Sequence, residues 1–227
     1  MKKRSFTLIE VLISIISLVI VLLSVYYIYK SGRNFWSSEQ SKLDVLRQVR
    51  TTFVKIERDL REAIIQPPNP ENPIGYPLKY FSPTKISFDR FKRYGNLLTQ
   101  EVTYEIVIVG EDAKIVKRTS DSLKEEVLLK TDLTEGPMPG QKVKYGLLAY
   151  NPEKSEEKTE FIGLDANFDP FKYDSLKLES EKQAYLQKHI TYDRVKTTSI
   201  IISIVVKDIH GNINRFQTHV YPRSRSF

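Results

Sequence analysis

The chain of 227 residues contains no cysteine, which excludes disulfide bonds, thiolate metal sites, iron–sulfur clusters and cysteine nucleophiles. It has only three histidines, His189, His210 and His219, and their separations match no metal-binding spacing. The sequence also lacks a nucleotide-binding glycine loop, a nucleophile elbow and a zinc motif. We therefore predict a protein that is not an enzyme and that carries no cofactor.

Charge is missing from one long segment near the N-terminus. Residues 11–29 include no charged residue, no proline and no glycine. As an α-helix rising about 1.5 Å per residue, this segment spans roughly 29 Å, close to the thickness of the hydrocarbon core of a bilayer. A secretory signal peptide has a shorter apolar region and a small-residue cleavage site, whereas this run ends in the bulky residues 26–29. Three cations at 2–4, against Lys30 and Arg33 beyond the run, favour a single-pass segment with a cytoplasmic N-terminus.

Glu10 is the one charged residue between positions 6 and 29. An acidic side chain at the centre of a membrane helix costs about 2.5–3.5 kcal/mol on insertion scales, and less towards the helix end. An intramembrane carboxylate is therefore a functional candidate, and it needs a cationic partner. The natural partner is an ammonium group that would be created by cutting the chain just before Phe6.

The segment Lys2–Leu12, KKRSFTLIEVL, resembles the leader of a type IV prepilin and the start of its stalk helix. The resemblance implies that a membrane aspartic peptidase, the prepilin peptidase, cleaves between Ser5 and Phe6 and N-methylates Phe6. It also implies that Glu10 pairs with the terminal amine of a neighbouring subunit, and that the apolar helix passes from the inner membrane into the core of a filament. The residue before the cut is usually glycine in this family, so Ser5 departs from the pattern.

A second, amphipathic pattern predicts that the helix continues beyond the membrane segment. Apolar residues recur at steps of three and four, which is typical of a helix that covers a sheet. Pro67 and Pro68 end the pattern, so the stalk is expected to run from Phe6 to Ile65. The expected parts are a cleaved leader at 1–5, a membrane half at 6–29 and an amphipathic half at 30–65. The residues expected to dock the head and partner subunits are Leu43, Leu46, Val49, Phe53, Ile56, Leu60 and Ile64.

Within this pattern the string Glu57–Ala63, ERDLREA, resembles the minor pseudopilin J of type II secretion and the W-type minor pilins. The resemblance implies a subunit at or near a filament tip. Its partners would be other minor and major pilins or pseudopilins, including I- and K-like ones, and an inner-membrane assembly platform. Charged helices commonly contain such strings, however, so the alternative is a solvated helix face with ion pairs worth a few tenths of a kcal/mol each.

The rest of the chain predicts an α+β fold of the pilin type, in which the second half of the stalk packs on an antiparallel β-sheet. A proline-rich connector at 66–83 is expected to lead into a β-rich head at 84–227. A short helix is predicted over Asp174–His189. The strand patterns cover residues 85–91, 102–109, 114–118, 126–129, 143–150, 197–207 and 213–221.

One pattern of oxygen-bearing side chains resembles the start of a calcium loop. Asp165, Asn167 and Asp169 stand at i, i+2 and i+4, the positions from which calcium loops commonly take ligands. The sixth position is Pro170 instead of glycine and the twelfth is Leu176 instead of glutamate, so the segment is not an EF-hand. We predict an Asx-rich turn without a metal and keep calcium as the alternative, because some pseudopilins bind it.

The net charge is +7 and the isoelectric point is about 9.3. Removal of the leader would take away three cations and leave a net charge of +4. Nucleic acid is not favoured as a partner, because a modestly basic, solvated surface explains this excess. The alternative is a DNA-binding minor pilin of a transformation pilus, whose phosphate ligands would be Lys196, Lys207, Arg215, Arg223 and Arg225.

Together these patterns favour a structural protein, a minor pilin or pseudopilin that helps to initiate a filament for protein secretion or for a related pilus. The prediction places the chain in the inner membrane, in contact with lipid, with the head in the periplasm. Two alternatives stay open: the DNA-binding minor pilin, and an unprocessed single-pass anchor that carries a sensor or binding domain.

Overall fold

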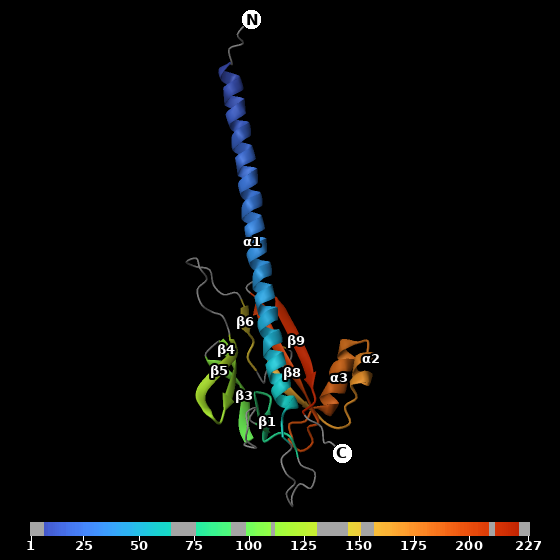
Figure 1. Ribbon diagram of the computed structural model, residues 1–227. Coiled ribbons are helices and arrows are strands. Elements are labelled where there is room, and N and C mark those ends of the chain that lie inside the picture. Colours follow the sequence, from blue (N-terminus) through green and yellow to red (C-terminus); the bar gives the residue numbers. More distant parts are fainter. Residues whose placement is uncertain are drawn as a thin grey trace, which may run out of the picture. The chain divides into compact units, whose positions relative to one another are not determined.

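A computed structural model of the chain contains a long N-terminal helix followed by antiparallel β-sheets, an α+β architecture (Figure 1). The chain divides into two compact units, Met1–Asp44 and Val45–Phe227. Helix α1 (Leu8–Arg61) contributes its first part to one unit and its second part to the other. The structure describes residues 7–64, 76–91, 99–109, 112–130, 145–150, 157–208 and 212–222.

The first sheet is an antiparallel meander in which each strand pairs with the next along the chain. Its strands are β1 (Tyr80–Ser82), β2 (Lys85–Phe91), β3 (Thr99–Val109), β4 (Asp112–Thr119) and β5 (Ser122–Lys130). Alternation along the strands gives one apolar face. Ile86 and Phe88 of β2 stand opposite Tyr104 and Val102 of β3, and all four side chains are buried.

The second sheet is centred on one long, apolar strand. Its members are β6 (Tyr145–Leu147), β7 (Glu160–Leu164), β8 (Ser199–Asp208) and β9 (Ile213–Val220). Strand β9 pairs with one edge of β8, while β7 and β6 pair with the first and second halves of its other edge. Strand β8 therefore has neighbours on both sides, and residues 199–206 are buried on both faces. This explains the unbroken run of apolar and small residues in its sequence.

The core of the head lies between the second part of α1 and the inner faces of both sheets. Every fully buried aliphatic or aromatic side chain of this kind contributes about 1.5–3 kcal/mol to folding. The largest contributors from the three layers include Val49, Ile56, Leu60, Phe88, Tyr104, Ile115, Phe161, Ile202 and Ile204.

The opposite face of the second sheet is covered in part by two short helices, α2 (Pro170–Ser175) and α3 (Glu179–His189). Leu186 of α3 packs on Ile162, Leu164 and Ile201, which form a second, smaller core. The segment that follows α3 in sequence lies directly against β7. A Cβ atom added to Gly163 of β7 would lie only 2.1 Å from the carbonyl oxygen of Thr191 in that segment.

The structure confirms most of the predicted elements and departs from the prediction at four places, three of them after α1. Tyr80–Ser82, which the pattern placed in the proline-rich connector, forms β1, and residues 65–75 of that connector lie outside the described part. Glu160–Leu164 forms β7, a strand without alternation because it is buried on both faces. The helix predicted over Asp174–His189 is two helices, since residues 176–178 interrupt it.

Helix α1 also ends earlier than the prolines predict. The pattern extended the helix to Ile65, but its last helical residue is Arg61. The amide of Ile64 instead donates a hydrogen bond of 2.7 Å to the carbonyl oxygen of Asp89 in β2. Pairing with a strand of the head therefore ends the helix before the first proline is reached.

Candidate functional site

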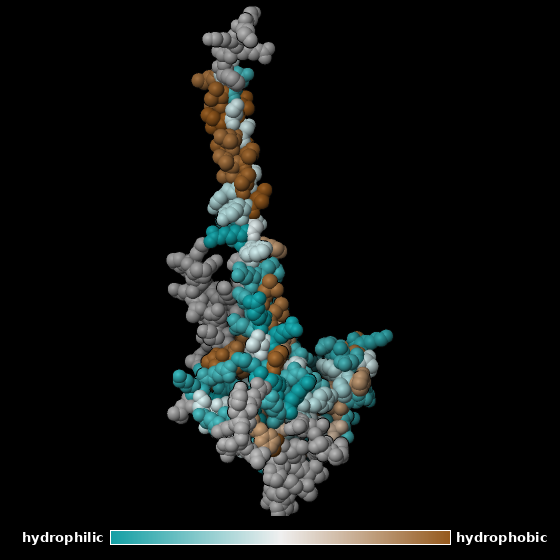
Figure 2. All heavy atoms as spheres, in the orientation of Figure 1, coloured by the Kyte–Doolittle hydropathy of each residue, from teal (hydrophilic) through white to brown (hydrophobic). Residues whose placement is uncertain are grey.

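The N-terminal part of α1 is the first candidate site. Residues Leu8–Trp36 form a helix that is long and apolar enough to cross a membrane, and no other helix among the described residues passes this test. All of its side chains are exposed in the structure, so none of its apolar surface is used to pack the protein's own core. Figure 2 shows the N-terminal part of this stretch as a mostly hydrophobic surface, which gives way to hydrophilic residues towards its C-terminal end. The segment is consistent with a single-pass membrane anchor, and it extends beyond the predicted 6–29.

Glu10 lies in the first turn of this helix and its carboxylate is held by Thr7. The amide nitrogen of Thr7 donates to Glu10 Oε2 at 2.9 Å, and the Thr7 hydroxyl donates to the same oxygen at 3.1 Å. In return, the amide of Glu10 donates to Thr7 Oγ1 at 3.4 Å. This is a capping box, which the T-x-x-E spacing in the sequence would have predicted. Ser5 and Phe6, the predicted cleavage and methylation site, lie outside the described residues.

The second candidate site is the predicted docking stripe of α1, whose residues differ in how deeply they are buried. Val49, Ile56 and Leu60 are buried in the core of the head as predicted, and Phe53 and Ile64 are partly buried. Leu46 is 47% exposed and Leu43 is 61% exposed, so their predicted role in docking a partner subunit stays a prediction. The buried face of the helix is rotated and consists of Val45, Val49, Thr52, Ile56, Asp59, Leu60 and Ala63.

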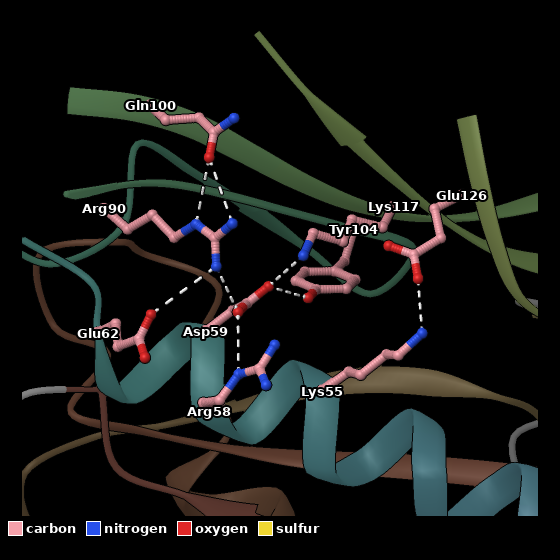
Figure 3. Close-up of polar contacts among 9 residues, drawn as sticks. All are labelled: Lys55, Arg58, Asp59, Glu62, Arg90, Gln100, Tyr104, Lys117 and Glu126. Atoms are coloured by element: carbon pink, nitrogen blue, oxygen red, sulfur yellow. Dashed lines mark hydrogen bonds and ion pairs between the residues drawn. The ribbon is translucent and has the colours of Figure 1, made fainter. Parts of the chain in front are cut away.

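Asp59, a fully buried carboxylate, explains where this face lies (Figure 3). Arg90 Nη1 donates to its Oδ1 at 2.6 Å, and Lys117 Nζ and Tyr104 Oη each donate to its Oδ2 at 2.6 Å. The three donors come from β2, β4 and β3 in turn, and Tyr104 and Lys117 are direct cross-strand partners. The Asp59 cluster, as we call these four residues, therefore joins α1 to three neighbouring strands of the first sheet.

The electrostatics of the Asp59 cluster favour the charged form of its carboxylate. Burial acts to raise the pKa of Asp59, but the hydrogen bonds of Lys117 and Tyr104 and the charges of Lys117 and Arg90 outweigh it and hold the pKa below its usual value. Burial, reinforced by the Asp59 charge, raises the pKa of Tyr104, so its hydroxyl stays protonated and remains a donor. Arg90 is steadied in turn by Gln100 Oε1 at 3.3–3.4 Å.

The Asp59 cluster tests one interpretation of the string Glu57–Ala63, the solvated helix face, residue by residue. A solvated helix face describes Arg58 and Arg61, which are exposed, and Arg61 makes an ion pair with Glu57 four residues earlier. It is wrong for Asp59, which is 0% exposed. The sequence contains no local signal for this burial, because the cations that make it possible lie on strands far along the chain.

The third candidate, the calcium-like pattern, uses its carboxylates to hold the local backbone. Asp165 Oδ1 accepts a hydrogen bond from the amide of Asn167 at 2.9 Å, an Asx turn, and lies 3.1 Å from His189 Nδ1. Asp169 Oδ1 accepts from the amide of Phe171 at 2.9 Å and caps helix α2. No group of three or more potential metal ligands is present among the described residues.

A groove of about 580 Å³ lies between α3 and the outer face of the second sheet. Its lining includes Glu157, Lys158, Glu160, Glu179, Ser203 and Arg215. Glu160 is nearly buried, and this burial raises its pKa, although Lys158 Nζ at 2.9 Å from its Oε2 opposes the rise. The groove presents more carboxylates than cations, so its charge does not favour a phosphate ligand.

The basic residues of the DNA-binding alternative are not gathered into one surface by the described part of the chain. Arg215 lines the groove beside glutamates. Lys196 is exposed and lies 3.9 Å from Asp193, and Lys207 is exposed at the end of β8. Arg223 and Arg225 lie outside the described residues.

No protein-family model, no curated protein and no solved structure matches the chain. The long N-terminal apolar helix followed by antiparallel sheet is compatible with a pilin-like architecture.

Proposed function

We propose that the protein is a minor pilin or pseudopilin, a structural subunit at or near the tip of a filament that serves type II secretion or a related pilus. The observation that carries the proposal is Glu10, the one charged residue between positions 6 and 29 and the fifth residue after the predicted cut before Phe6. A soluble core helix or a plain anchor has no use for such a charge, whose cost in a membrane is about 2.5–3.5 kcal/mol at the centre.

In this proposal the first part of α1 acts first in the membrane and then in the filament. The exposed span Leu8–Trp36 holds the subunit in the inner membrane, with the head in the periplasm, and later packs against the spans of other pilins. In the assembled filament the carboxylate of Glu10 exchanges its Thr7 contacts for the methylated amine of Phe6 of a neighbour. A desolvated ion pair of this kind specifies the axial register between helices, because a charge left unpaired there is costly.

The N-terminal mass of the full chain, purified from membranes of cells that contain a prepilin peptidase, tests the processing step. We expect a first residue of methylated Phe6. A chain that keeps Met1 would overturn the proposal in favour of an unprocessed single-pass anchor.

Incorporation into filaments tests the assembly step. Glu10→Ala should enter the membrane normally but fail to join sheared filaments. The control is Glu39→Ala, which removes a half-exposed carboxylate of the same helix that makes an ion pair with Lys42, and this variant should be incorporated like the unmodified chain. Normal incorporation of Glu10→Ala would show that the carboxylate has no role in assembly.

A further inference from the structure

The second part of α1 exposes a row of arginines on the side that faces away from the head. Arg47, Arg50, Arg58 and Arg61 are all exposed, and Val54, which is 54% exposed, stands in the middle of the row. At 3.6 residues per turn these five positions fall on one face of the helix. We call this face the arginine stripe.

The orientation of the arginine stripe follows from the packing of the head. Val49, Ile56 and Leu60, on the other side of the same helix, are buried in the core, and Asp59 is tied to three strands of the first sheet. The helix is therefore unable to turn its arginines inward without burying their charges and exposing the core residues. The stripe is a surface that the fold holds outward.

The charge on this surface is only partly compensated within the described residues. The stripe itself carries no carboxylate. Arg61 contacts Glu57 at its flank, and Arg58 Nε lies 3.7 Å from Asp59, whose oxygens already accept three bonds of 2.6 Å from other donors. The guanidinium groups of Arg58 and Arg61 thus retain hydrogen-bonding capacity towards an outside partner.

The choice of residues indicates what kind of partner fits. The chain as a whole has more lysine than arginine, yet its helix positions 45–61 contain four arginines and one lysine. Arginine binds carboxylates and phosphates with a planar, bidentate fork. Exposed Val54 within the stripe and exposed Leu46 at its side add apolar surface, and arginine with apolar residues and little lysine is the composition of protein–protein interfaces.

We propose that the arginine stripe docks a carboxylate-bearing face of a second polypeptide, a helix with Asp or Glu at steps of three and four around an apolar residue that meets Val54. Positive charge alone would fit a carboxylate or a phosphate, but the helical spacing of the stripe and the exposed Val54 in its middle support a polypeptide helix over a nucleic acid or a lipid headgroup. The identification of that polypeptide as a neighbouring filament subunit rests on the proposed function, whereas the acidic, helical chemistry of the partner does not.

The absence of cysteine allows a sharp test with the full chain in its native membranes. Val54→Cys introduces a single thiol at the centre of the stripe, to which a maleimide benzophenone photo-crosslinker is attached. Replacing Arg47, Arg50, Arg58 and Arg61 by glutamine in this background should lower the yield of the cross-linked protein adduct by about tenfold or more. The matched control replaces four exposed lysines by glutamine, Lys124, Lys177, Lys188 and Lys196, and should leave the yield unchanged.

A charge exchange then separates docking from mere proximity. Changing the four arginines to glutamate should abolish the adduct, and changing the acidic residues of the cross-linked partner peptide to arginine should restore it. An equal yield in the arginine and lysine variants, an adduct removed by nuclease or extracted as lipid, a partner peptide without carboxylates at helical spacing, or a failed exchange would each overturn the proposal.

The N-terminal mass keeps the two proposals distinguishable. If the chain retains Met1 but the charge exchange restores the adduct, the proposed pilin function is wrong and the proposed docking surface stands. If the chain begins at Phe6 but the charge exchange does not restore the adduct, the proposed pilin function stands and the proposed docking surface is wrong.

Discussion

The two parts of helix α1 place an acidic side chain in opposite environments. In the first part, Glu10 is bound only by the N-terminal turn of its own helix among the described residues, and the surrounding apolar side chains are exposed. In the second part, Asp59 is bound by side chains of three different strands and is completely buried. The first part is thus available to lipid or to other chains, while the second is committed to the protein's own head.

The largest expected effect on this comparison comes from Asp59→Ala. Removing the carboxylate leaves Arg90 and Lys117 nearly buried without their counter-charge, so the head should lose about 3–5 kcal/mol of its free energy of unfolding. Urea denaturation of the detergent-solubilised chain, followed by circular dichroism, measures this loss. Glu10→Ala should leave the same free energy unchanged, and an equal loss in both variants would contradict the division of α1 into two parts.

A smaller loss of unfolding free energy should distinguish the buried side of the second part of α1 from its exposed side. Leu60→Ala should cost the head about 2–5 kcal/mol, because Leu60 is fully buried and its truncation leaves a cavity. Leu46→Ala should change stability by no more than about 0.5 kcal/mol, because the side chain is half exposed. The same denaturation experiment compares them, and a cost at Leu46 as large as at Leu60 would show that the buried face is not the one observed.

Replacing one glycine in each unit by alanine should change stability in opposite directions. Gly163→Ala should lower the melting temperature of the head and cost about 1–3 kcal/mol, since the new methyl group meets the Thr191 carbonyl oxygen and the Phe81 ring. Gly32→Ala should instead stabilise the local helix by about 0.5–1 kcal/mol, since nothing lies within 4 Å of the added atom. Amide hydrogen exchange around Gly32 measures the second effect, and faster exchange in the variant would contradict it.

The pH dependence of the head gives the smallest effect. The pKa of Asp59 is lowered in the folded state, so its stabilising contribution is complete above the unfolded pKa of about 3.9 and is lost as the pH falls through the lower, folded pKa. The difference in unfolding free energy between the unmodified chain and Asp59→Asn should therefore be constant between pH 5 and 7 and shrink below about pH 4. A difference that stays constant down to pH 2 would show that this carboxylate does not titrate with the fold.

Local patterns in the sequence predict a large part of this fold. The apolar run of residues 11–29 predicts the span, and the alternation in residues 85–91 predicts β2 with the bounds that the structure has. They miss β7, because a strand buried on both faces has no alternation, and they miss the end of α1, because the bond from Ile64 to Asp89 is tertiary. The capping box between Thr7 and Glu10, by contrast, follows from the local T-x-x-E spacing.

The sequence alone predicts an apolar N-terminal helical segment with one carboxylate, followed by an antiparallel head, because hydropathy and strand alternation are local properties of the chain. Only the tertiary structure decided which side of α1 the head covers, and hence that Leu46 and the arginine stripe stay outside. The apolar spacing alone fits either rotation of the helix. The choice is made by Asp59, whose partners Arg90, Tyr104 and Lys117 lie 31, 45 and 58 residues further along the chain. A carboxylate is buried only where such donors meet it, and folding alone brings them together.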